Sequence, residues 1–219
     1  VEVYGSFPCE VTISEADRSW LSYVPAEDGK GGSFVVAKNT TGAMRGSIVE
    51  VTCGERIYSY AIMQYDVVDL LGIYQGQYIS LLDQQTYGLS NVVISGPDAS
   101  GVYTIDGLLE GETGCAIKAT YENNMFSISA GQKLKAYDEV PAFDIHFGLM
   151  NLSARSYWTS EYTVGLVPVF VEGAGIGLSF EDNGGMPNTF AGLSFSLFRG
   201  DTYYDDYEIL LRCLLYRPN

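Results

Sequence analysis

Apolar and polar residues alternate with a period of two through the first third of the chain. The stretch from Trp20 to Gln64 contains four such runs, at residues 20–22, 33–39, 45–52 and 58–64, and Gly and Asn interrupt it where turns are needed. This pattern is typical of consecutive antiparallel strands with one buried face. Two shorter runs, residues 1–4 and 9–14, precede it. Together they predict a small immunoglobulin-like β-sandwich of about six strands, with Trp20 and Leu21 in its core.

A polar hinge at residues 65–69 separates this unit from a second series of runs, so we expect one domain at 1–66 and another at 67–219. Eight to ten short strands with Gly-rich turns predict a larger antiparallel β-barrel-like domain, either a closed barrel or a curved open sandwich. No segment has a sustained helical period, and the expected fold class is all-β. The expected strands are residues 71–79, 91–94, 102–105, 115–121, 125–128, 143–147, 164–171, 175–180, 190–198 and 208–216.

The composition agrees with a folded β-rich chain, with 25 Gly, 17 Tyr, 47% hydrophobic and only 18% charged residues. The net charge of −15 disfavours nucleic acid and anionic membrane surfaces as partners, because both attract Lys and Arg. Neutral glycans and host or surface proteins stay open as partners. No run of 18 apolar residues occurs, so the sequence predicts no transmembrane helix. It also shows no signal peptide, as expected of a processed chain.

The four cysteines, Cys9, Cys53, Cys115 and Cys213, include no C-x-x-C pair of the kind that zinc sites use. Two in each expected domain permit the disulfides Cys9–Cys53 and Cys115–Cys213, one of three possible pairings. The sequence favours free, buried thiols instead, because cysteine behaves as a small core hydrophobe. Both arrangements stay open.

Several residues of the first domain also match a family pattern. They are the run Trp20-Leu21-Ser22, the strand from Phe34 that ends at Asn39, Arg45 three residues before the strand at Ile48, and the terminal Gln64. In this combination, residues 5–65 resemble a BACON domain, a Bacteroidetes-associated module named for a proposed carbohydrate-binding role. The resemblance implies an exported, lipid-anchored protein of the cell surface or periplasm, with this domain as a spacer. The lipid anchor would be its only link to a membrane, and that anchor is not part of this chain.

The opening of the second domain, Gly72-Ile73-Tyr74, is similar to the glycine-aromatic start of lipocalin-type barrels. It is also similar to the β-barrel modules that follow BACON domains in Bacteroides surface lipoproteins. The resemblance therefore implies a lipocalin-like barrel in the second domain.

Few residues offer catalytic or metal chemistry. His146 is the only histidine, with Asp144 on the same expected strand face, and no G-x-S-x-G motif supplies a nucleophile. Asp201, Asp205, Asp206 and Glu208 form an acidic cluster without the spacing of an EF-hand. We expect an acidic surface loop there, with a loose cation site or a catalytic carboxylate pair as lesser alternatives. The sequence predicts no catalytic residue, no metal site and no cofactor.

Aromatic residues give the stronger signal. Two polar segments carry closely spaced aromatic side chains beside carboxylates and amides, the groups that bind sugar rings and sugar hydroxyls. An alternative is that these side chains pack on loops with their polar tips in water. The candidate ligand-binding residues are Tyr157, Trp158, Tyr162, Tyr203, Tyr204 and Tyr207.

From these observations we expect a non-enzymatic cell-surface binding or adhesion protein that recognises glycans. The alternative is a lipocalin-like binder of a small apolar ligand inside the second domain. A hydrolase is the least supported class.

Overall fold

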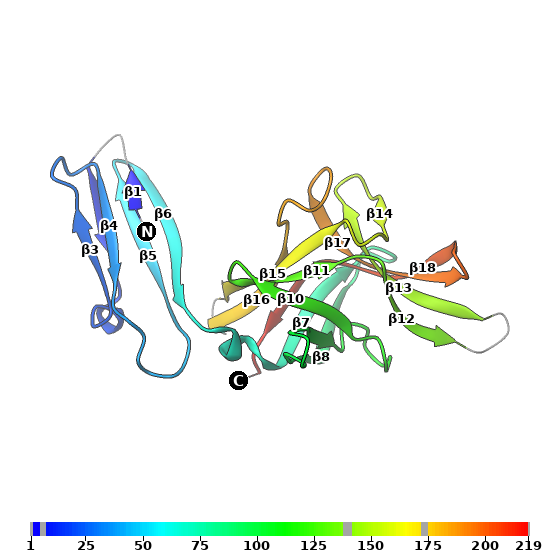
Figure 1. Ribbon diagram of the computed structural model, residues 1–219. Coiled ribbons are helices and arrows are strands. Elements are labelled where there is room, and N and C mark those ends of the chain that lie inside the picture. Colours follow the sequence, from blue (N-terminus) through cyan, green and yellow to red (C-terminus); the bar gives the residue numbers. More distant parts are fainter. Residues whose placement is uncertain (1, 5–7, 138–141, 172–174, 219) are drawn as a thin grey trace. The chain divides into compact units, whose positions relative to one another are not determined.

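The computed structural model describes residues 2–4, 8–137, 142–171 and 175–218, and the chain forms two compact units, Val1–Asp69 and Leu70–Asn219 (Figure 1). The boundary expected from the sequence, after residue 66, lies just before a short 3-10 helix, η2 (Val67–Leu70). Val1 of the expected first strand, and residues 5–7 of the segment that resembles a family, lie outside the described residues. No helix among the described residues is long and apolar enough to cross a membrane.

The first unit is a sandwich of two three-stranded antiparallel sheets. One sheet has the order β1 (Glu2–Tyr4), β4 (Gly31–Val36), β3 (Leu21–Pro25), and the other β2 (Cys9–Thr12), β5 (Arg45–Cys53), β6 (Arg56–Gln64). A 3-10 turn, η1 (Glu15–Asp17), follows β2. The alternating residues predicted to point inward form one core between the sheets, and Trp20 and Leu21 are part of it as expected. This core consists of Ile13, Trp20, Leu21, Phe34, Val49, Val51 and Ile62.

Arg45 connects the two sheets of this sandwich. Its guanidinium lies 4.5 Å from the centroid of the Trp20 ring, and its Nη2 donates to the carbonyl of Ala37 at 2.8 Å. Its Nε donates to Oε1 of Gln64 at 2.7 Å, and Nε2 of Gln64 donates to the same Ala37 carbonyl at 3.0 Å. The arginine, tryptophan and glutamine singled out in the sequence therefore meet in one cluster.

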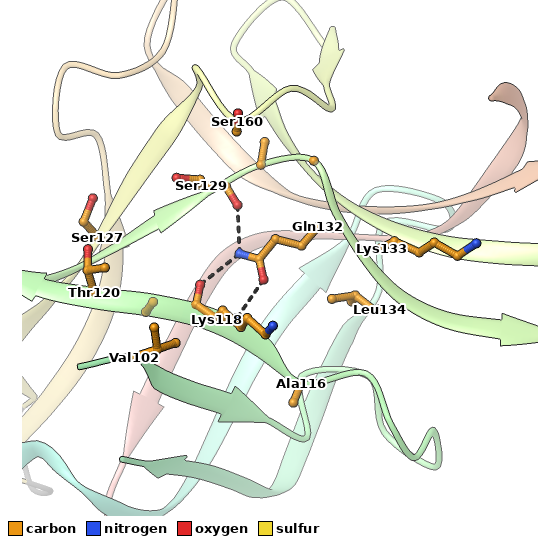
Figure 2. A pocket seen from close by; sticks show the side chains of 13 residues that line it. Val102, Ala116, Lys118, Thr120, Ser127, Ser129, Gln132, Lys133, Leu134 and Ser160 are labelled. Atoms are coloured by element: carbon orange, nitrogen blue, oxygen red, sulfur yellow. Dashed lines mark hydrogen bonds between the residues drawn. The ribbon is translucent and has the colours of Figure 1, made fainter. Parts of the chain in front are cut away.

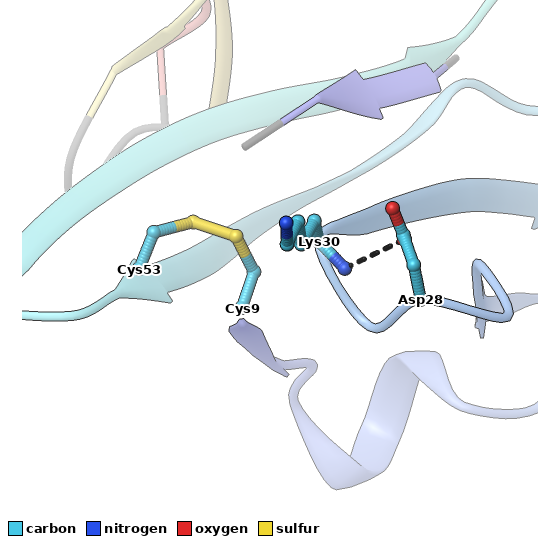
Figure 3. Close-up of a disulfide and its surroundings, with 4 residues drawn as sticks. All are labelled: Cys9, Asp28, Lys30 and Cys53. Carbon is cyan, nitrogen blue, oxygen red and sulfur yellow. Dashed lines mark hydrogen bonds between the residues drawn. A yellow bond between two sulfur atoms is a disulfide. The ribbon is translucent and has the colours of Figure 1, made fainter. Parts of the chain in front are cut away.

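The cysteines divide into two kinds. Cys9 and Cys53 face each other on the neighbouring strands β2 and β5 and form a disulfide (Figure 3). The backbone N–H of Cys9 also donates to the carbonyl of Gly29, at 3.1 Å, in the turn between β3 and β4. Cys115 and Cys213 are free and buried. The expectation of free thiols is thus wrong for the first pair, since the register of β2 and β5 places the two sulfurs together, and confirmed for the second.

The second unit is built on a closed antiparallel barrel of eight strands. Hydrogen bonding runs around the ring from β7 to β11, on through β15 and β16 to β18, and back to β7. Closure between β18 and β7 joins residues such as Leu210 and Ser80, which are far apart in sequence. The ring consists of β7 (Gly72–Ser80), β8 (Thr86–Ser95), β9 (Tyr103–Asp106), β10 (Ile117–Glu122), β11 (Met125–Ser129), β15 (Thr163–Val171), β16 (Gly175–Glu181) and β18 (Thr202–Tyr216).

Large side chains occupy the inward positions of the ring. Tyr103, Tyr121 and Phe126 form an aromatic trio, with each of the first two rings 5.2 Å from that of Phe126. Tyr74 is 1% exposed, and its hydroxyl donates to the carbonyl of Leu70 at 3.0 Å. Ile94, Ile105, Ile117 and Ile128, on the ring strands β8 to β11, are also fully buried.

Three more strands extend from β18 as a wing beside the ring, in the order β12, β13, β17, β18 (Figure 1). They are β12 (Gln132–Tyr137), β13 (Phe143–Asn151) and β17 (Phe190–Arg199), and the short β14 (Ser156–Tyr157) pairs with β13. β12 and β14 are not among the strands expected from the sequence. The last strand was expected to start at Glu208, whereas β18 begins at Thr202. The acidic segment expected to be a loop is therefore mostly strand, because pairing with β17 continues to the two-residue turn at Gly200 and Asp201.

Candidate functional site

The candidate site is one face of the wing, which we call the aromatic face. In antiparallel sheets, directly paired residues point to the same side. The register pairs His146 with Ser196 and Ser196 with Asp206, and it pairs Phe198 with Tyr203. Ser196 and Phe198 are two residues apart on β17, so all five side chains share this face.

Three aromatic rings cluster on the aromatic face. Trp158 lies 5.3 Å from Tyr203 and 5.4 Å from Phe198, and Phe198 and Tyr203 are 5.9 Å apart, all between ring centroids. Trp158 reaches this face because it packs on Gly148, where an added Cβ would lie 2.5 Å from its ring. Tyr203 stays 42% exposed, while Phe198 is buried. The cluster therefore presents an exposed tyrosine supported by a half-buried tryptophan.

A chain of hydrogen bonds fixes Trp158 in this position. Its indole N–H donates to Oγ of Ser196 at 3.3 Å, and Ser196 donates to Oδ1 of Asp206 at 3.0 Å. The hydroxyl of Ser194 lies 3.0 Å from that of Ser196. Both serines are fully buried. Burial and the carboxylates of Asp206 and Asp205 raise the pKa of Tyr203, so its hydroxyl keeps its proton.

His146 stacks on Phe198, with ring centroids 4.4 Å apart. Burial lowers its pKa below the usual value, although Asp144 opposes this effect. Asp144, on the same face as expected, binds Nζ of Lys133 at 2.5 Å. Nε2 of His146 is buried and has no hydrogen-bond partner among the described residues. The histidine is thus a neutral, packed ring.

Ser196, His146 and Asp206 come from three adjacent strands but do not form a nucleophile–base pair. Among the described residues, no hydrogen bond joins His146 to Ser196, and the serine hydroxyl donates its hydrogen bond to Asp206. Ser196 has no exposed surface from which to attack a substrate. A serine activated by a base needs both a contact to the base and access to the substrate.

The remaining four candidate residues lie in other positions. Tyr157 and Tyr162 pair with each other, with ring centroids 4.5 Å apart, and Nδ2 of Asn151 donates to the Tyr157 hydroxyl at 3.2 Å. Both are half-buried, less exposed than a free polar loop would leave them. They border the loop that carries Trp158 but make no ring contact with it among the described residues.

Tyr204 and Tyr207 turn away from the aromatic face. Tyr204 contacts Phe143, whose neighbour Asp144 pairs with Phe198, so Phe143 points to the opposite side. Tyr207 donates to Glu112 at 2.6 Å, and the same carboxylate binds Nζ of Lys135 at 2.7 Å. Of the six candidates, the structure brings Trp158 and Tyr203 together on the aromatic face, and it pairs Tyr157 and Tyr162 with each other outside that face.

The acidic cluster is also divided. Asp206 lies on the aromatic face, where it accepts a hydrogen bond from Ser196. Glu208 instead accepts hydrogen bonds from Ser80 at 2.7 Å and from Tyr78 at 3.4 Å, both on the barrel strand β7. Burial, together with this contact to Glu208, raises the pKa of Tyr78 strongly. No group of three or more potential metal ligands occurs among the described residues.

Phe198, Ser194 and Ser196 belong to the site but were not among the candidates. The alternation Ser194-x-Ser196-x-Phe198 would have placed them on one strand face. Nothing in the sequence near them indicates that Trp158 covers that face.

Comparisons of this chain with protein-family models, with curated proteins and with solved structures find no match.

Proposed function

We propose that this chain is a non-enzymatic binding protein that recognises glycans through the aromatic face of its barrel unit, with the N-terminal sandwich as a spacer. The observation that carries the proposal is the Trp158–Tyr203 contact at 5.3 Å beside the Asp206 carboxylate. Aromatic planes bind the C–H faces of sugar rings, and carboxylates accept hydrogen bonds from sugar hydroxyls. The two kinds of group lie together here.

Preorganisation supports this assignment. The Trp158 ring is held by its hydrogen bond to Ser196 and by packing on Gly148, so ligand binding would cost little side-chain entropy. The Tyr203 hydroxyl keeps its proton and interacts with the Asp206 carboxylate, so a pair of polar groups lies beside the aromatic rings.

The family resemblance supports the setting of the proposal. The cluster of Trp20, Arg45 and Gln64 gives a structural reason for the residues that resemble a BACON domain. The Cys9–Cys53 disulfide fits an oxidising, extracytoplasmic location, where such bonds persist. We therefore propose export to the cell surface, with a lipid anchor outside this chain.

A glycan array probed with the full chain would identify the ligand, and titration of that glycan would test the site. Tyr203→Ala should weaken binding by roughly three- to tenfold, the worth of one aromatic contact. Tyr87→Ala is the matched control, because Tyr87 and Tyr203 are both 42% exposed and Tyr87 lies on β8, outside the wing. Equal losses in both variants, or no loss in either, would remove the site from the aromatic face.

The alternative, a lipocalin-like binder of an apolar ligand, has one supporting observation, the closed eight-stranded ring. The aromatic trio of Tyr103, Tyr121 and Phe126 and the buried isoleucines between the strands favour the first proposal, since they occupy the space such a ligand would need. Residues 190–198 lie on β17, outside the ring.

A further inference from the structure

A second candidate site lies in the barrel wall, where β10 and β11 separate. The two strands pair at Glu122–Met125, Tyr121–Phe126 and Thr120–Ser127, and their register ends there. Beyond this point the side chain of Gln132 takes the place of a strand residue. Its Oε1 accepts from the backbone N–H of Lys118 at 2.7 Å, and its Nε2 donates to the carbonyls of Lys118 and Ser129, both at 2.9 Å (Figure 2).

The separation leaves a hollow of about 440 Å³ on the outer wall. This volume is within the range of small-molecule pockets. Outward-facing residues of β10 and β11, the chain at 130–134 and Ser160 line it, over a floor that includes the buried Ala119 and Ala130. Because the oxygen and both N–H donors of the Gln132 amide are bonded to the backbone, its orientation is fixed before any ligand arrives.

Four hydroxyl side chains belong to the lining of the hollow. Those of Thr120, Ser127, Ser129 and Ser160 make no hydrogen bond to any residue of the described ranges. Each hydroxyl can donate once and accept twice. The lining therefore offers several donors and acceptors to a polar ligand.

The charge of the lining is opposite to that of the chain. It contains two lysines and no Asp or Glu, whereas the whole chain has 27 acidic and 12 basic residues. Lys133 binds Asp144, and Figure 2 shows its side chain extending away from the other lining groups. Lys118 makes no ion pair within the described part of the chain. Its charge helps to lower the pKa of Asp98, but the Asp98 carboxylate accepts a hydrogen bond from the backbone N–H of Ser100 in its own turn. Lys118 is therefore the cation available to a ligand.

We propose that this hollow binds a small anionic ligand that is rich in hydroxyls, of the sugar-acid class. The carboxylate would pair with Lys118, and the ligand hydroxyls would bond to Thr120 and the serines. A charged hydrogen bond of this kind is stronger than a neutral one and would give selectivity over the uncharged sugar. The site does not depend on the aromatic face.

The test is a titration of the full chain with sodium glucuronate, glucose and sodium acetate, followed by backbone amide NMR. Glucuronate should bind saturably and shift the Lys118 amide, with glucose and acetate each at least roughly tenfold weaker. Lys118→Gln should weaken glucuronate at least about tenfold and leave glucose nearly unchanged. Lys38→Gln, which removes an exposed lysine of the first unit, should change neither.

Further arms separate the possible outcomes. If methyl glucuronide binds with the same affinity as free glucuronate, the ligand is a terminal sugar acid of a glycan. If methyl glucuronide does not bind, the ligand is the free sugar acid. Absence of saturable binding, equal affinity for glucuronate and acetate, or no effect of Lys118→Gln would overturn the proposal. Tyr203→Ala should leave glucuronate affinity unchanged, which separates this site from the aromatic face.

Discussion

The disulfide of the first unit should supply a large part of that unit's stability. Cys9 and Cys53 are 44 residues apart in sequence and join neighbouring strands. Closing a loop of this length restricts the unfolded chain by about 4 kcal/mol at 25 °C in the chain-entropy description. A folded unit that ends at Asp69 has a total stability of roughly 3–10 kcal/mol. We therefore expect the double variant Cys9→Ala, Cys53→Ala to lose about 4 kcal/mol, between roughly two-fifths and all of the stability of the sandwich.

The two tryptophans allow each unit to be followed separately. Trp20 is in the sandwich core at 7% exposure, and Trp158 is in the barrel unit. In a Trp158→Phe background, fluorescence reports the sandwich alone during urea unfolding. With a slope of about 1–2 kcal/mol/M for a unit of this size, the midpoint should fall by roughly 2–4 M or the transition should disappear.

Two further variants make the result decisive. Cys115→Ala in the same background is the control, because this buried cysteine is free and lies in the other unit. In a Trp20→Phe background, loss of the disulfide should leave the Trp158 transition in place. The reasoning is refuted if the sandwich loses less than about 1 kcal/mol, or if both tryptophans report the same loss.

Three more predictions concern the barrel unit. Because burial lowers the pKa of His146 in the folded protein, this histidine is protonated in the unfolded chain at a higher pH, about 6.5, than in the folded chain. Stability should therefore decline with pH from there down to the folded pKa, and chemical denaturation of His146→Phe across this range should show a smaller slope. Gly107→Ala should destabilise the barrel by about 1–3 kcal/mol more than Gly101→Ala, measured by thermal unfolding. Both glycines have positive φ, but only at Gly107 would the new Cβ meet a backbone oxygen, that of Asn91 at 2.2 Å. Burial raises the pKa of Cys213 to about 12, so iodoacetamide should modify it only after denaturation, as mass spectrometry can show; rapid labelling of the native protein would contradict this.

The sequence alone determined the class of the fold and most of its strands. Period-two alternation fixes which side chains can be buried together, and this is a local property that a single strand already carries. The core position of Phe34 agrees with it, as does the strand beginning near Gly72. Trp20 and Leu21 are adjacent, and both can be buried because Trp20 precedes β3 and is not bound by its alternation. β12 was not predicted although Leu134 and Ala136 alternate with two lysines, and β14 has only two residues, too few to show a period.

Only the tertiary structure decided which candidate residues meet. The closure of β18 on β7 and the pairing of Cys9 with Cys53 join positions that no local pattern relates. On β18, Tyr204 and Tyr207 are the extra residues of two irregularities in the register with β17. Each extra residue shifts the alternation by one, so Tyr203 and Asp206 reach the same face although they are three positions apart. A bulge depends on the partner strand, and the composition of the aromatic face was therefore set by strand pairing, not by sequence spacing.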